Sequence, residues 1–79
     1  MISVRQLKAA RALLGWSQDE MAARSGLSRT TLGRLEMADE RLGGYATTRD
    51  KIVSTFEAAG ITFLAEDDGS EGVMIRGAE

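Results

Sequence analysis

Apolar residues recur at three- and four-residue spacing along most of the chain, and near the C-terminus this helical period gives way to alternation. The helical period predicts helices over about 4–14, 18–25, 29–37 and 48–59. The alternation predicts two short strands, over 61–65 and 73–76, around an acidic turn that contains glycine. The predicted fold class is therefore mainly α: four helices followed by a C-terminal two-stranded β-hairpin.

Each of the first three predicted helices is preceded by a serine that can cap it. The caps are Ser3, Ser17 and Ser28. A cap that satisfies an orphan amide of the first turn is worth typically ~1 kcal/mol. Gln6 and Glu20 can complete capping boxes with the first two serines, whereas Thr31 leaves the third box incomplete. Apolar staples are expected at the same three starts: Ile2 with Leu7, Trp16 with Met21, and Leu27 with Leu32.

Glycines suited to the left-handed conformation end the first two helices, at Gly15 and Gly26. The second helix, the turn at Gly26-Leu27 and the third helix then make a helix-turn-helix, in which a short turn with glycine sets the helices at a steep angle. In DNA-binding proteins this arrangement projects its second helix into the major groove. The apolar residues expected to converge in the core are Met21, Ala22, Leu27, Leu32 and Leu35 with Leu7, Ala10 and Leu14.

The residue types that are missing exclude several kinds of chemistry. The chain has 79 residues, which suits one small domain, and it contains no cysteine and no histidine. Disulfides, zinc sites built from Cys and His, and nucleophilic mechanisms with a histidine base are thereby excluded. The carboxylates of Glu66-Asp67-Asp68 lack the spacing of a calcium loop and are expected to form a solvated turn. We therefore expect no metal, no cofactor and no enzymatic activity.

The charge is distributed unevenly along the chain. The net charge is −2, yet residues 1–38 hold six cations against three anions (+3), and residues 39–79 hold four cations against nine anions (−5). The first half can therefore face phosphates, while the second half cannot easily do so. No apolar run approaches the roughly 20 residues of a membrane span, and the N-terminus lacks a signal-peptide pattern. These features favour the cytoplasm.

The segment "WSQDEMAARSGLSRTTLGRLE", residues 16–36, resembles the lambda-repressor/Cro-like (XRE-type) helix-turn-helix family. The positions that match the family pattern are Gln18, Glu20, Ala22, Gly26, Ser28, Leu32, Leu35 and Glu36. The resemblance extends over about residues 3–59. It implies a DNA-binding domain over residues 1–60 and regulation of bacterial or phage transcription, with repression as the expected effect. The protein would act as a homodimer on a pseudo-palindromic operator of double-stranded DNA, in the cytoplasm at the nucleoid.

The resemblance also implies roles for single residues. The family's base-reading positions hold Arg29, Thr30 and Arg34, and Gln18 would bind a phosphate and brace the start of the recognition helix. Arg11 and Glu36 match a structural ion pair between helices one and three. These roles agree with the chemistry, because arginine binds the O6/N7 edge of guanine in bidentate fashion and threonine can contact a thymine methyl group.

Other residues could add phosphate contacts or depart from the family pattern. The exposed helix start at Ser28 suits a phosphate, and so does Arg41 in the loop after the recognition helix. Gly33 takes a place where the family carries a longer side chain. It is either a position of close approach to DNA or one that the protein does not use.

The tail at residues 61–79 also departs from the family, which commonly continues with a fifth helix that contributes to dimerisation. A hairpin alone is marginal, so it must pack on the helices or pair with another copy. We expect it to be the dimerisation element. The apolar side chains available are Ile61, Phe63, Val73 and Ile75. The rival interpretation is a protein-interaction module, such as an antitoxin or anti-activator, that binds a protein partner through its acidic second half.

Overall fold

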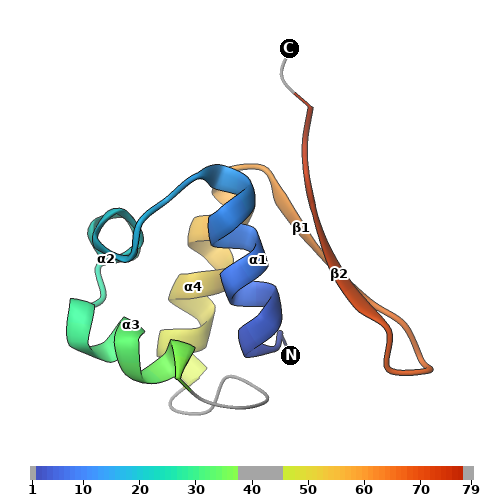
Figure 1. The fold of residues 1–79 in the computed structure, drawn as a ribbon, viewed down its shortest axis with the longest axis horizontal. Coiled ribbons are helices and arrows are strands. Elements are labelled where there is room, and N and C mark those ends of the chain that lie inside the picture. Colours follow the sequence, from blue (N-terminus) through green and yellow to red (C-terminus); the bar gives the residue numbers. More distant parts are fainter. Residues whose placement is uncertain (1, 38–45, 78–79) are drawn as a thin grey trace.

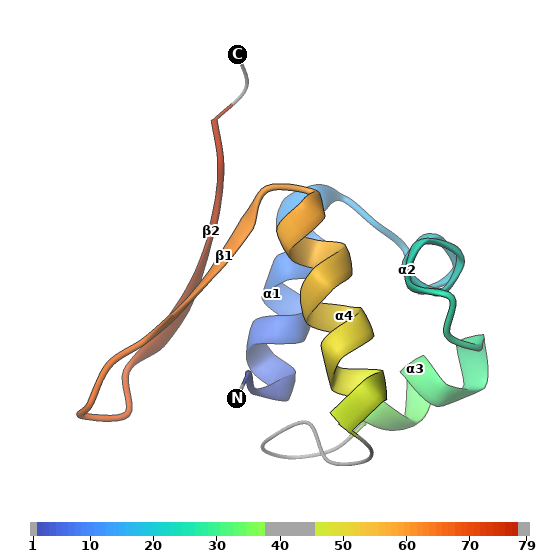
Figure 2. The same ribbon diagram turned by 180° about the vertical axis from the view of Figure 1, so that it is seen from behind.

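A computed structural model describes residues 2–37 and 46–77 of the chain. Its elements are α1 (Val4–Leu14), α2 (Gln18–Ser25), α3 (Arg29–Glu36), α4 (Ala46–Ala58), β1 (Ile61–Ala65) and β2 (Glu71–Ile75). Viewed down the shortest axis, α1 lies in front of α4 in the middle of the molecule, with α2 and α3 on one side and the hairpin on the other (Figures 1 and 2). The predicted fold class is confirmed. The boundaries differ at three elements: α3 ends one residue earlier than predicted, α4 begins two residues earlier and ends one residue earlier, and β2 is shifted toward the turn.

The helix starts follow from their serine caps. Ser3 Oγ accepts from the amide of Gln6, and Gln6 Oε1 accepts from the amide of Ser3, so the first capping box is complete. Ser17 also caps α2, but the predicted box with Glu20 is wrong. The Glu20 carboxylate accepts instead from Arg24 Nε at 2.8 Å, one turn further along the helix.

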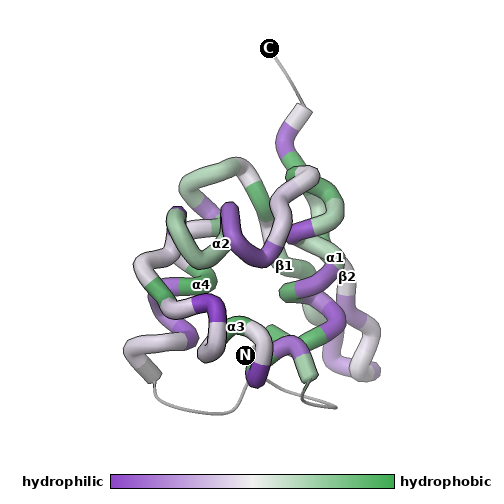
Figure 3. Tube along the Cα trace, turned by 60° about the vertical axis from the view of Figure 1, so that its left-hand side comes forward, coloured by the Kyte–Doolittle hydropathy of each residue, from purple (hydrophilic) through white to green (hydrophobic). Residues whose placement is uncertain are grey.

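The core joins all parts of the described fold. Its buried apolar side chains are Ile2, Val4, Leu7, Ala10, Met21, Leu32, Ile52, Phe56 and Ile61. Hydrophobic and hydrophilic residues are interspersed along the helices (Figure 3). At helical spacing such a pattern gives a helix one apolar face. Phe56 lies at the centre of the core, stacked on Trp16 with ring centroids 5.8 Å apart and meeting Phe63 of β1 edge-on at 5.9 Å. The hairpin is thus packed into the same core as the helices.

The two strands pair antiparallel, with Phe63 opposite Val73 and Leu64 opposite Gly72. A buried side chain of α1 connects them: Gln6 Nε2 donates to the carbonyl of Leu64 at 2.9 Å and to that of Gly72 at 3.0 Å. These contacts explain why β2 begins earlier than its apolar run, since long-range partners hold a segment that has little strand propensity of its own.

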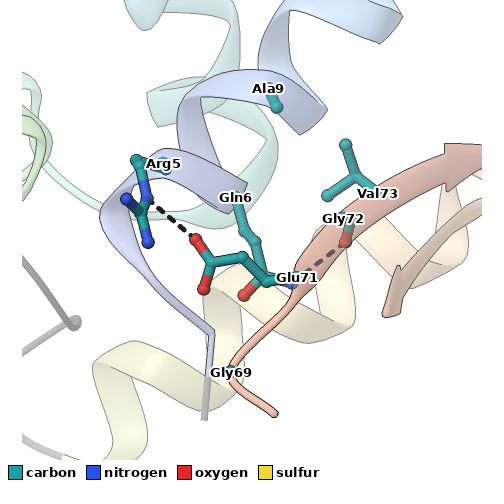
Figure 4. A pocket seen from close by; sticks show the side chains of 7 residues that line it. All are labelled: Arg5, Gln6, Ala9, Gly69, Glu71, Gly72 and Val73. Carbon is teal, nitrogen blue, oxygen red and sulfur yellow. Dashed lines mark hydrogen bonds and ion pairs between the residues drawn. The ribbon is translucent and has the colours of Figure 1, made fainter. Parts of the chain in front are cut away.

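A carboxylate of β2 adds a second link between the hairpin and α1. Glu71 Oε1 accepts from Ser3 Oγ at 2.6 Å and from Arg5 Nε at 2.9 Å. Figure 4 shows Arg5 and Gln6 of α1 converging on this end of β2, around an open cavity of about 400 Å³. The start of α1 and the hairpin are therefore joined by polar as well as apolar contacts.

Within residues 2–37 and 46–77, no helix has the length and apolar character needed to cross a membrane. The same residues contain no group of three or more His, Cys, Asp or Glu side chains that could hold a metal ion.

Candidate nucleic-acid interface

The turn between α2 and α3 is built by one glycine and two serines. Gly26 has φ 76°, a left-handed conformation that costs a glycine nothing and strains other residues. Ser25 Oγ accepts from the amide of Leu27, and Ser28 Oγ accepts from the amide of Thr31 at 3.0 Å, which starts α3 at once. The chain therefore leaves one helix and enters the next within three residues.

Helix α3 has one buried side and one exposed side. Leu32 is fully buried in the core, and Glu36 is 5% exposed. Arg29, Thr30 and Arg34 are all exposed. Since residues 29, 30, 33 and 34 fall on one face at 3.6 residues per turn, the three polar side chains share the outward face of the helix.

The end of α3 is fixed by a buried carboxylate. Glu36 pairs with Arg11 in bidentate fashion, with Oε2 2.8 Å from Nε and Oε1 2.9 Å from Nη2. This is the ion pair that the family resemblance implied. Arg11 Nη1 also donates to the carbonyl of Trp16 at 2.9 Å. One guanidinium thereby holds α1, the connection to α2 and the last turn of α3 together.

The ionisation of Glu36 follows from these partners. Burial by itself would raise the pKa of the carboxyl, but the hydrogen bonds from Arg11 and Gln18 and the charge of Arg11 hold the pKa below its ordinary value. The carboxylate therefore stays charged at neutral pH, and the bidentate pair is kept.

Gln18 was expected to brace the start of the recognition helix, but it braces the end. Its Nε2 donates to Glu36 Oε1 at 2.9 Å, so it supports the last turn of α3 and not the first. The physical reason is that Glu36 presents two buried carboxylate oxygens next to the start of α2. Gln18 remains partly exposed, at the N-terminus of α2 where free amides suit a phosphate.

Arg29, in the first turn of α3, has an ion-pair partner that the sequence pattern did not single out. Arg29 Nε donates to Asp19 Oδ1 at 2.9 Å, and the pair links the starts of α2 and α3. Gly33 lies one turn after Arg29, and a Cβ added there would stand 3.9 Å from Arg29 Nη1. The missing side chain of Gly33 thus leaves open space beside the Arg29 guanidinium. A spacing of ten residues carries no periodic signal, so only the folded turn reveals this pair.

Arg41 and Ser28 are the other two residues for which a phosphate contact was expected. Arg41 lies outside the described residues. Ser28 is exposed, and its hydroxyl also donates to the Thr31 hydroxyl at 2.8 Å. Trp16, the predicted staple residue, is partly buried and packs against the core: it stacks on Phe56, and its ring centroid lies 4.6 Å from the Arg24 guanidinium carbon.

Most of the side chains expected at a dimer contact already have partners within the chain. Ile61 is 3% exposed, and Phe63 and Val73 pack against the same core. Of the four, Ile75 is the most exposed, at 36%. The reason is the alternation of strands: the apolar face that the sequence offers is the face that covers α1 and α4. The opposite face carries Leu64 and Met74, which are 44% and 53% exposed.

A tight turn between α2 and α3, an anchored recognition helix and an outward polar face define a helix-turn-helix DNA-binding domain. Residues 7–42 match the family model described as helix-turn-helix, which agrees with the resemblance of residues 16–36 to the XRE, or lambda-repressor/Cro-like, type. No curated protein matches the chain.

Proposed function

We propose that the chain is a sequence-specific regulator of transcription, a repressor that binds a pseudo-palindromic operator as a homodimer with α3 in the major groove. The observation that carries the proposal is the outward face of α3, where Arg29, Thr30 and Arg34 are exposed on a helix whose other face is buried. Two such helices, related by a two-fold axis, would enter successive major grooves about 34 Å apart. The site of action would be the nucleoid in the cytoplasm.

The base-reading role of α3 follows from its chemistry. Each arginine can donate two parallel hydrogen bonds to guanine, and the threonine methyl can contact thymine. Gln18, Ser28 and the free amides at the starts of α2 and α3 would bind the flanking phosphates. Because the chain carries a net charge of −2, non-specific attraction to DNA is weak and specific contacts must supply much of the affinity.

A mobility-shift assay with duplexes recovered from a randomised pool tests this assignment. Arg29→Ala and Arg34→Ala should each weaken binding by about 5- to 150-fold, the equivalent of one lost bidentate base contact. Arg76→Ala makes the same change of charge beyond β2 and serves as the matched control, with an affinity close to that of the parent. If both α3 variants bind like the parent, the assignment is wrong and the rival, a protein-interaction module that uses the acidic second half, is favoured.

For the dimer, we propose that two hairpins associate. An outer strand edge of one would pair with that of the other, and the face that carries Leu64 and Met74 would be covered. The described sheet has only two strands, so each strand keeps an outer edge that could pair with another strand. Leu64 and Met74 would then be covered by the second copy. Deleting residues 61–79 is a poor test, because Ile61 and Phe63 belong to the core of the protomer.

A single substitution on the exposed face tests the dimer without disturbing the core. Met74→Arg should convert the dimer to a monomer in sedimentation velocity, whereas Met37→Arg, at an 84% exposed position after α3, should leave it intact. A Met74→Arg variant that still sediments as a dimer would exclude this face.

A further inference from the structure

The Asp19–Arg29 pair crosses the turn between α2 and α3 and lies at the surface. The side chain of Asp19 is 85% exposed and that of Arg29 is 55% exposed. Ion pairs so accessible to water contribute little to stability. The consequence of this pair is therefore the orientation that it gives to the Arg29 guanidinium.

The orientation follows from which nitrogen is engaged. Asp19 Oδ1 accepts from Nε, at the base of the guanidinium fork, so both Nη groups remain available at its tip. Nη1 lies beside Gly33, 3.9 Å from the place where a Cβ would stand. A longer side chain at residue 33 would occupy that space. The carboxylate holds Nε, and the absence of a longer side chain at residue 33 leaves room for Nη1 along the outward face of α3.

An arginine held at Nε suits a particular base edge. Guanine presents two acceptors, O6 and N7, in the major groove, and the two Nη groups can donate to both at once. Holding the side chain in advance lowers the rotamer entropy lost when that contact forms. The negative charge of Asp19 also disfavours a swing of Arg29 onto a phosphate, because the carboxylate would then approach the phosphate with no cation between them.

We propose that Asp19 is a positioning residue that holds Arg29 for end-on, bidentate contact with guanine and thereby sets the base preference at the position that Arg29 reads. This inference rests on the proposed function, since it requires α3 to lie in the major groove.

The test compares base preference, not affinity alone. The parent protein first selects duplexes from a randomised pool, and these are then altered one base pair at a time. The position at which Arg29→Ala no longer prefers one base over the others is taken as the position that Arg29 reads. At that position, Asp19→Asn should lower the preference for guanine over the other bases by about tenfold, while binding to random duplex is unchanged or tighter. In the Arg29→Ala background, Asp19→Asn should have no further effect. Asp50→Asn, the same change at an exposed acid of α4, should leave the preference intact.

The possible failures separate this inference from the function on which it rests. If Arg29→Ala loses the preference but Asp19→Asn keeps it, Asp19 does not position Arg29, and the proposed function stands. If Asp19→Asn tightens binding to every duplex by the same factor, the carboxylate only masks a charge, and the inference is wrong. If Arg29→Ala and Arg34→Ala both bind like the parent, the proposed function itself fails. Thermal unfolding of Asp19→Asn should match that of the parent, which excludes misfolding as the cause.

Discussion

The buried carboxylate of Glu36 offers a stringent test of how the recognition helix is held. Replacing Glu36 with glutamine keeps the shape of the side chain but removes its charge. The new amide group is also a donor, and it would face the donors of Arg11 and Gln18. Removing one partner of a buried ion pair costs about 3–5 kcal/mol, because the other charge is left buried. Glu36 is 5% exposed and the Arg11 side chain 23% exposed, so water can partly hydrate the remaining guanidinium. We therefore expect a loss of about 2–4 kcal/mol.

A loss of this size is large for so short a chain. At about 0.05–0.15 kcal/mol per residue, the whole domain has a free energy of unfolding of only about 4–12 kcal/mol. The thermal midpoint measured by circular dichroism should fall by roughly 10–30 °C in Glu36→Gln. Glu20→Gln is the matched control, since Glu20 and Arg24 form an exposed pair whose side chains are 46% and 52% accessible. Its cost should stay near 0.5 kcal/mol, to within about a factor of two.

The pH dependence of the same comparison has a definite sign. The pKa of Glu36 is lowered in the folded protein from an ordinary value of 4.5, so the carboxylate stabilises the fold above that pH and loses this effect as the pH falls through the folded pKa. The difference in the free energy of unfolding between the parent and Glu36→Gln should therefore be largest at neutral pH and become smaller in acid. Equal midpoints for Glu36→Gln and Glu20→Gln at neutral pH, or a difference that grows in acid, would refute this reasoning.

Three further substitutions probe the glycines and the hairpin. Gly33→Ala should stabilise the protein by up to about 1 kcal/mol and leave DNA affinity unchanged, because the added Cβ meets only Arg29 at an ordinary distance. A strong loss of affinity would mean instead that DNA approaches the backbone there. Gly26→Ala should cost about 1–2 kcal/mol by chemical denaturation from its left-handed backbone alone, since nothing lies within 4 Å of the added Cβ. Gln6→Leu should cost about 1–3 kcal/mol and speed amide exchange in the hairpin more than in α4; equal acceleration in both would show that Gln6 does not link the hairpin to α1.

Local signals explain what could be predicted from the sequence. The cap at Ser28 and the glycine at Gly26 act within a few residues, so the turn between α2 and α3 is readable from the chain alone. Apolar periodicity likewise identifies the buried face of α3 and, by exclusion, its outward face.

Contacts between distant residues are what the sequence could not show. Three hydrogen bonds depend on how the elements are placed in space. They join Gln18 to Glu36, Arg29 to Asp19, and Gln6 to the hairpin. The hairpin adds a further case. Its alternation correctly identifies an apolar face, but alternation cannot tell whether that face covers the protein's own helices or a second copy.

The central claim is that the outward face of α3 reads DNA sequence. The most direct measurement is a titration of ¹⁵N-labelled protein with a duplex recovered from a randomised pool, followed by amide chemical shifts. The account predicts that the largest shifts fall on residues 28–37 and on the start of α2, that a scrambled duplex produces much smaller ones, and that residues 61–75 are little affected. Shifts concentrated in the hairpin, with 28–37 unchanged, would contradict it.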